Sequence, residues 1–277
     1  MRFLLNLQSI DRRIVYILLV IAVWIPLRWN VIGIDPKVSK EVKSAYDTIE
    51  NVEDGKIAII SVLWGAGTLA ENRPQTEAIA RHLFQKGVPF AILPWDLQGT
   101  TLAEQAVERI AEEMGKKEGV DWISLGYRPA YIDQIIMSMA VDFQGTFSTD
   151  RNGIPLSKIP MTKNIKSVKD IGVVMETTPS NTIPAWIQFL GQKYDVPILY
   201  GPTAVMVPEG YNYLDTGQIK GMLPGMMGAA QYEVLLEHRG FGRRAADALS
   251  AAHLLIILLI IVGNIGFFMA RTRRADM

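Results

Sequence analysis

Apolar and polar positions divide the chain into two long apolar runs near its ends and a mixed stretch between them. Residues 249–270 form a continuous apolar run that contains no formally charged side chain. An α-helix needs about 20 consecutive apolar residues to cross the hydrocarbon core of a bilayer. We therefore predict a transmembrane helix at residues 249–270, followed by a basic tail at residues 271–277.

The first apolar run, at residues 14–34, is less regular because Arg28 interrupts it. A long arginine side chain at the end of a span extends its charge to the interface, and Trp24 and Trp29 are typical of the aromatic belt. The alternative is a cleaved signal peptide, but no small-residue cleavage site follows the run. We predict a further transmembrane helix at residues 14–34, preceded by a cytoplasmic tail at residues 1–13.

The lysines and arginines that flank each span predict how the chain is oriented in a membrane. The flanks that face the chain ends and those that face the middle domain carry nearly equal numbers of basic residues, so the predicted orientation rests on finer features. A short basic tail before an apolar run is typical of a signal anchor, and the Arg-Thr-Arg-Arg at residues 271–274 is typical of a stop-transfer flank. We expect a two-pass membrane protein with both termini in the cytoplasm and the intervening domain outside. The opposite orientation remains the alternative.

Short apolar runs alternate with amphipathic segments between the two spans, which is the signature of an α/β fold with a mainly parallel sheet. The runs are almost continuously apolar, as in strands that are buried on both faces. Strands are expected at residues 56–63, 88–93, 122–125, 171–175 and 196–200. Helices are expected at residues 74–85, 102–114, 131–140 and 183–190. The predicted fold is an α/β domain at residues 35–247 with a doubly wound, mainly parallel sheet of about five strands, flanked by one N-terminal and one C-terminal transmembrane helix.

The segment at residues 142–170 breaks this alternation. It contains a turn at residues 150–153 and two prolines, and its apolar residues follow no helical period. Long irregular insertions in compact domains are usually functional loops. Two interpretations stay open, a lid or contact arm on one side and surface decoration on the other.

Candidate binding residues gather where the predicted strands end. In an open parallel sheet, ligands bind beyond the carboxyl ends of the strands. The residues there that suit a ligand are Trp64, Gly65, Gly67, Thr68, Asp96, Tyr127, Arg128, Glu176 and Tyr200. Arg128 would contact an anionic group, the aromatic rings would stack, and Asp96 or Glu176 would form hydrogen bonds. The glycines match neither a dinucleotide fingerprint nor a phosphate-binding loop, and turn or cap residues are the alternative interpretation.

Composition narrows the possible chemistry. The chain has 28 basic and 28 acidic residues, and its basic residues are scattered, which argues against a nucleic-acid partner. It has no cysteine, and none of its three histidines has a neighbour at metal-ligand spacing. Asp96 and Glu176 form a conceivable carboxylate pair, although such residues more often cap helices. We predict no metal and no cofactor, and the chemistry favours a protein that is not an enzyme.

Glycine and methionine are concentrated at residues 217–230. Glycines recur every fourth residue at Gly217, Gly221 and Gly225, and on a helix this spacing would make a bare ridge for close backbone contact. Flexible apolar contacts would come from Met222, Met226 and Met227. The partner of this ridge would be the domain's own sheet, another subunit or the membrane surface. Within the second span, Asn264 between two nearby glycines is a further candidate for helix docking.

Together these patterns predict a membrane-anchored α/β binding or assembly module, a structural subunit of a homo-oligomeric or larger membrane complex. Its expected partners are membrane lipids and either a second copy of the chain or another membrane protein. The alternative is a membrane-tethered enzyme or solute receptor that binds a small anionic ligand at the carboxyl ends of the strands.

Overall fold

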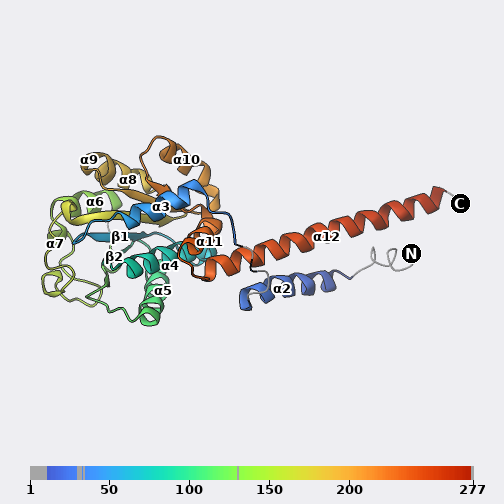
Figure 1. Cartoon of the computed structure of the whole chain (residues 1–277), viewed down its shortest axis with the longest axis horizontal. Helices are drawn as coiled ribbons and strands as arrows, with labels where there is room; N and C mark the ends of the chain where they lie inside the picture. The colour runs from blue at the N-terminus through green and yellow to red at the C-terminus, as the bar shows by residue number, and fades with distance from the viewer. Residues whose placement is uncertain (1–10, 30–32, 34, 130, 276–277) are drawn as a thin grey trace. The chain divides into compact units, whose positions relative to one another are not determined.

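A computed structural model describes residues 11–29, 33, 35–129 and 131–275. The chain divides into two units. One is an α/β unit at Pro36–Gly242, and the other contains the described residues that precede and follow it. Figure 1 shows the elements of each unit.

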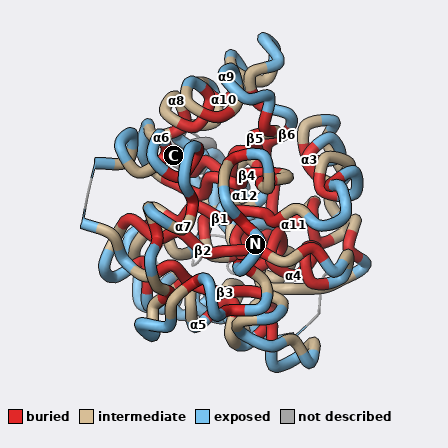
Figure 2. The backbone as a smooth tube through the Cα atoms, turned by 90° about the vertical axis from the view of Figure 1, so that its left-hand side faces the viewer, coloured by how far each residue is buried: buried red, intermediate tan, exposed pale blue. Residues whose placement is uncertain are grey.

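Six parallel strands form one sheet in the order β3-β2-β1-β4-β5-β6. Their bounds are β1 Ile57–Val62, β2 Phe90–Pro94, β3 Trp122–Ser124, β4 Ile171–Thr178, β5 Ile198–Pro202 and β6 Gly221–Met222. The strand order runs outward from β1 in one direction and from β4 in the other, so the direction of winding changes between these two strands. Figure 2 shows the strands as the buried centre of the α/β unit.

Helices cover both faces of the sheet, because side chains alternate along each strand and both faces are apolar. One face packs against α3 Lys40–Glu50, α4 Leu69–Lys86, α5 Leu97–Met114 and α11 Gly225–Leu235. The other face packs against α6 Ile132–Val141, α7 Phe143–Thr146, α8 Ile183–Trp186 and α10 Val207–Asp215. A π-helical turn at Ile187–Gly191 and the short α9 Gln192–Tyr194 continue α8. The prediction of an α/β domain with a parallel sheet is confirmed.

The insertion at residues 142–170 belongs to the core of one face. Its buried apolar side chains are Phe143, Phe147, Leu156, Ile159, Ile165 and Val168. They pack beside α6 and α8 although they follow no regular period in the sequence. The insertion therefore closes one face of the sheet, which neither a free arm nor surface decoration would do.

The glycine-rich segment is not the helix that its spacing suggested. Gly217 lies in a turn with a φ of 72°, Gly221 is the first residue of β6, and α11 begins only at Gly225. A side chain on Gly221 would collide with the backbone of Ala45 on α3. The predicted helical ridge is wrong, because backbone hydrogen bonds pair β6 with β5 and the close approach occurs within the domain. Met222 is buried there, whereas Met227 is exposed.

Two helices lie in the other unit, α2 Arg12–Arg28 and α12 Phe241–Ala275, the second of which begins in the α/β unit. Among the described residues, one helical stretch, Phe241–Phe268, is long and apolar enough to cross a membrane. This agrees with the C-terminal span expected from the sequence. α2 has 17 residues, and the predicted N-terminal span extends into residues 30–32 and 34, which lie outside the described residues.

Candidate functional site

Three side chains form a row on one face of the sheet, close to its carboxyl edge. Strand register places Ser61 of β1 beside Glu176 of β4, and Glu176 beside Tyr200 of β5. All three are buried, on the face that also carries Trp95 and Trp186. The row crosses the boundary between β1 and β4, where the winding of the sheet changes direction. In open parallel sheets this is the place where ligands bind.

Glu176 is completely buried and incompletely paired. The hydroxyl of Thr182, in the loop before α8, donates a hydrogen bond to its Oε1. Its Oε2 and the Nε1 of Trp186 have no partner within hydrogen-bond distance, although Ser61 and Trp186 are near enough to the carboxyl group to stabilise its charge. The Nε1 of Trp95 donates to the Ser61 hydroxyl at 2.7 Å. A buried acceptor and a buried donor without partners are costly, since each has lost its hydrogen bonds to water.

Burial raises the pKa of Glu176 to about 7. The hydroxyls of Ser61 and Thr182 and the indole of Trp186 act in the opposite direction, because they stabilise the charged form. Burial has the larger effect. The carboxyl group of Glu176 therefore exchanges its proton near neutral pH, which is a property typical of functional sites and also found in structural networks.

A surface groove lies next to this row, between α6 and α8. It has a volume of about 520 Å³ and is lined by Tyr131, Ile132, Asp133, Asn181, Thr182, Pro184, Ala185, Gln188 and Phe189. We call it the α6–α8 groove. Thr182 lines the groove and its hydroxyl donates to Glu176, so this residue lies between the groove and the buried carboxyl group.

Of the residues predicted after β1, Trp64 and Gly65 contact other parts of the domain, whereas Gly67 and Thr68 make no such side-chain contact. Trp64 is buried on the opposite face of the sheet, where its Nε1 donates to Thr76 Oγ1 at 3.2 Å. In the loop that follows, the amide of Ala66 donates to Gln98 Oε1 at 3.1 Å. Gly67 faces open space. Gly65 lies against Gln98, and Thr68 precedes α4 without a side-chain hydrogen bond to cap it.

Asp96 and Arg128 also serve the fold. Asp96 caps α5 by accepting a hydrogen bond from the amide of Gly99 at 2.6 Å. Arg128 donates to the carbonyl oxygen of Thr149 at 2.8 Å, and its guanidinium lies 6.0 Å from the ring centre of Phe147. Both contacts of Arg128 are with the insertion. Of the nine candidate binding residues, the structure brings Glu176 and Tyr200 together in the row, while Tyr127 is exposed.

Ser61, Thr182 and Trp186 are site residues that the sequence analysis did not select. Ser61 lies inside an otherwise apolar strand, and Glu176 directly follows the apolar part of β4; polar residues at such buried positions are a signal for a polar row. The roles of Thr182 and Trp186 depend on how α8 folds back over β4. No local pattern in the sequence indicates that contact.

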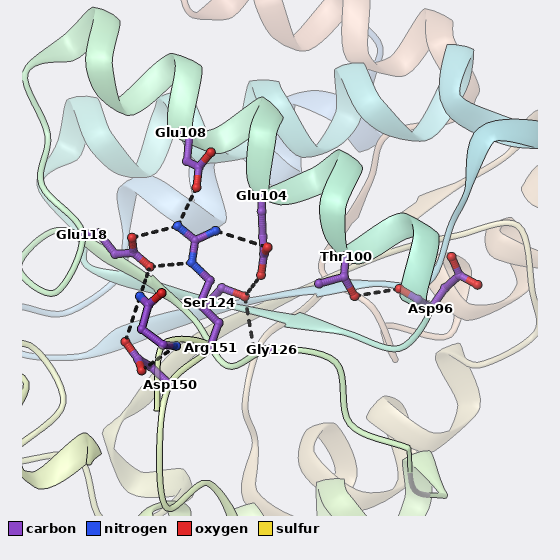
Figure 3. A network of polar contacts seen from close by, with 10 residues as sticks. Asp96, Thr100, Glu104, Glu108, Glu118, Ser124, Gly126, Asp150 and Arg151 are labelled. Carbon is purple, nitrogen blue, oxygen red and sulfur yellow. Dashed lines mark hydrogen bonds and ion pairs between the residues drawn. The ribbon is translucent and has the colours of Figure 1, made fainter. Parts of the chain in front are cut away.

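A second polar cluster fixes the insertion to α5 beyond the end of β3 (Figure 3). Arg151 pairs with Glu104 at 3.2 Å, with Glu108 at 2.5 Å and with Glu118 at 2.8 Å. The amide of Arg151 donates to the carbonyl oxygen of Ser124 at 2.9 Å. Because the carboxylates surround a guanidinium, this cluster is a structural clamp. In the described part of the chain, no group of three or more His, Asp or Glu residues is arranged to hold a metal ion.

Comparisons with protein-family models, curated proteins and solved structures give no match for this chain. The functional argument therefore rests on the geometry of the chain itself.

Proposed function

We propose that this chain is a membrane-anchored α/β binding module, held in a bilayer by α12 and taking a small ligand at the α6–α8 groove. The anchor is carried by one observation. The stretch Phe241–Phe268 has 28 residues, and only 6 % of its most apolar window is buried. A core helix of a soluble protein would bury such a surface, and exposing it to water would cost about 25 cal/mol per Å². A lipid environment removes this cost.

The N-terminal helix supports a second anchor. α2 is apolar over most of its length, and its 17 residues would extend about 26 Å, slightly less than the roughly 30 Å hydrocarbon core. Arg28 lies 5.9 Å from the ring centre of Trp29, which in turn packs edge-on against Trp24. Arginine and tryptophan together at a helix end are typical of the membrane interface. We therefore propose a two-pass protein, and the basic flanks at Arg12, Arg13 and residues 271–274 favour both termini in the cytoplasm.

The binding role is supported by the position of Glu176 close to the α6–α8 groove. A buried carboxyl group with an unpaired oxygen lowers stability unless something offsets its desolvation. It lies at the carboxyl edge of the sheet, one hydroxyl away from a surface groove. This combination of a groove, convergent polar groups and a raised pKa is the usual basis for assigning a binding site.

Extraction at alkaline pH tests the anchor. Peripheral proteins leave membranes in alkaline carbonate, whereas proteins with inserted helices remain. We expect the full chain to remain with the membranes. Arginines at Leu258 and Ile261 should weaken this retention, because each charge costs about 3 kcal/mol at the centre of a span. Arginines at Gln105 and Glu112, which are exposed on α5, are the matched control. Release of the unaltered chain would contradict the anchor.

Assembly through α12 is a second candidate function, favoured by Asn264. Its side-chain amide donates only to the carbonyl oxygen of Ile260 on the same helix, at 3.0 Å, and the residue is exposed. Gly263 has open space around it. A polar amide and a small residue exposed to lipid favour association between helices. This observation supports a subunit of a homo-oligomeric or larger complex.

A further inference from the structure

We infer that the α6–α8 groove binds a small organic cation, a ligand that carries a protonated amine. This inference rests on the proposed binding function and adds the chemical class of the ligand. It differs from the anion expected from the sequence, because Asp133 is charged and no basic side chain lines the groove among the described residues.

The charges around the groove favour a cation. Asp133, exposed in the first turn of α6, is the one charged side chain among the described residues that line it. Arg128, the nearest basic residue in the sequence, donates to Thr149 and lies over Phe147 in the insertion. An anion in the groove would face this carboxylate, and no basic side chain among the described lining residues would offset the repulsion. A protonated amine would gain a charge-assisted hydrogen bond to that carboxylate.

The hydroxyl of Thr182 is oriented to accept. A threonine hydroxyl has one proton to donate, and Thr182 donates it to Glu176 Oε1. The lone pairs of the Thr182 oxygen are not used by this bond, so the residue can contribute an acceptor to the lining of the groove. The side-chain carbonyl oxygens of Asn181 and Gln188 add further acceptors to the lining. An ammonium group has three donors and no acceptor, so it matches this set.

Aromatic rings complete the site. Tyr131 lines the groove with 77 % of its surface exposed, and Phe189 lines the groove as a partly buried ring. A cation over an aromatic face is attracted by the ring quadrupole. Rings also pack against the carbon skeleton of a ligand. The groove thus combines a counter-ion, hydrogen-bond acceptors and apolar surface for an amine with an attached apolar group.

The test compares three fluorinated probes that differ in charge. 4-Fluorobenzylamine, 4-fluorobenzyl alcohol and 4-fluorobenzoate are each titrated against the full chain in nanodiscs at neutral pH, and binding is followed by fluorine NMR. Empty nanodiscs correct for partitioning into lipid. We expect saturable binding of the amine, at least about tenfold tighter than that of the alcohol or the benzoate.

Variants locate the binding. Asp133→Asn should weaken amine binding about tenfold, because it removes the counter-ion while leaving shape unchanged. Thr182→Val should also weaken amine binding, because valine has the size of threonine but lacks the hydroxyl acceptor. Glu112→Gln, an exposed carboxylate on α5, is the control and should bind like the unaltered chain. Melting curves confirm that each variant is folded.

Two results would overturn the inference in different ways. Equal binding of amine and alcohol, both lost in Tyr131→Ala and unaffected by Asp133→Asn, would keep the groove as a binding site and reject the cation. Saturable amine binding that survives Asp133→Asn, Thr182→Val and Tyr131→Ala alike would place the ligand elsewhere and reject both the cation site and the proposed groove.

Discussion

Glu176 links stability to pH, because a carboxyl group inside a strand is least costly when it is neutral. Its pKa is raised from 4.5 to about 7, so the folded chain holds this proton over a range where the unfolded chain has released it. The stability that the folded chain gains from keeping Glu176 protonated is fully present below pH 4.5 and is lost as the pH rises to about 7. The loss amounts to roughly 3 kcal/mol, since each pKa unit corresponds to about 1.4 kcal/mol.

Replacing Glu176 with glutamine should remove this dependence, because glutamine stays neutral and keeps the size of the side chain. We expect Glu176→Gln to gain stability relative to the unaltered chain as the pH rises from about 5 to about 8, by up to roughly 3 kcal/mol. Urea unfolding of both proteins in the same detergent, followed by tryptophan fluorescence, measures the difference. Glu112→Gln is the control. A difference that is constant across this range would mean that Glu176 ionises like an exposed glutamate.

The sequence could identify Glu176 and Tyr200, because residues at the ends of apolar strands are easily located. It could not show that Ser61 neighbours Glu176, since this depends on the register between β1 and β4. The same limit applies to Arg128. Its ligand contact stays a prediction, and no local pattern indicated that the insertion would bring Thr149 within hydrogen-bond distance of it.

At the scale of elements, five of the six strands coincide with apolar runs in the sequence. The sixth, β6, has two residues and no recognisable pattern. Regular glycine spacing suggested a helix there, but the glycines meet two other requirements. Gly217 and Gly225 have positive φ angles, whereas Gly221 gives α3 room beside the edge of the sheet. The insertion at residues 142–170 was equally hard to interpret, because the apolar residues that cover one face of the sheet follow no regular period in its sequence.

Gly221 provides a direct test of how β6 packs. A methyl group at this position would overlap the backbone of Ala45, so either α3 or β6 must move. We expect Gly221→Ala to lower the free energy of unfolding by about 1 to 3 kcal/mol. Gly67→Ala is the matched control, because a methyl group there meets no atom within 4 Å. Equal melting temperatures for the two variants would contradict the contact between β6 and α3. Loss of subunits from a Gly221→Ala variant of unchanged stability would instead support an assembly role for residues 217–230.

At the scale of the whole molecule, the remaining case for assembly rests on α12. Helices that associate in a bilayer gain from polar amides and small residues, by about 0.6 to 2 kcal/mol for each hydrogen bond. If Asn264 contributes to such a contact, Asn264→Leu should shift the detergent-solubilised protein towards smaller species. Mass photometry would detect the shift, and Ile257→Leu is a control on the same helix. An identical mass distribution for all three proteins would remove Asn264 from any subunit contact.

The central claim is that a membrane holds the α/β domain on one side and the chain ends on the other. Because the chain has no cysteine, single cysteines can report this directly. Lys163→Cys places one on the exposed surface of the insertion, and Met277→Cys places one at the C-terminus. Cells whose outer membrane, where present, has been opened are treated with a membrane-impermeant maleimide before and after lysis. We predict that position 163 is labelled before lysis and position 277 only afterwards. Equal labelling of both positions before lysis would contradict the claim, because no membrane would then separate them.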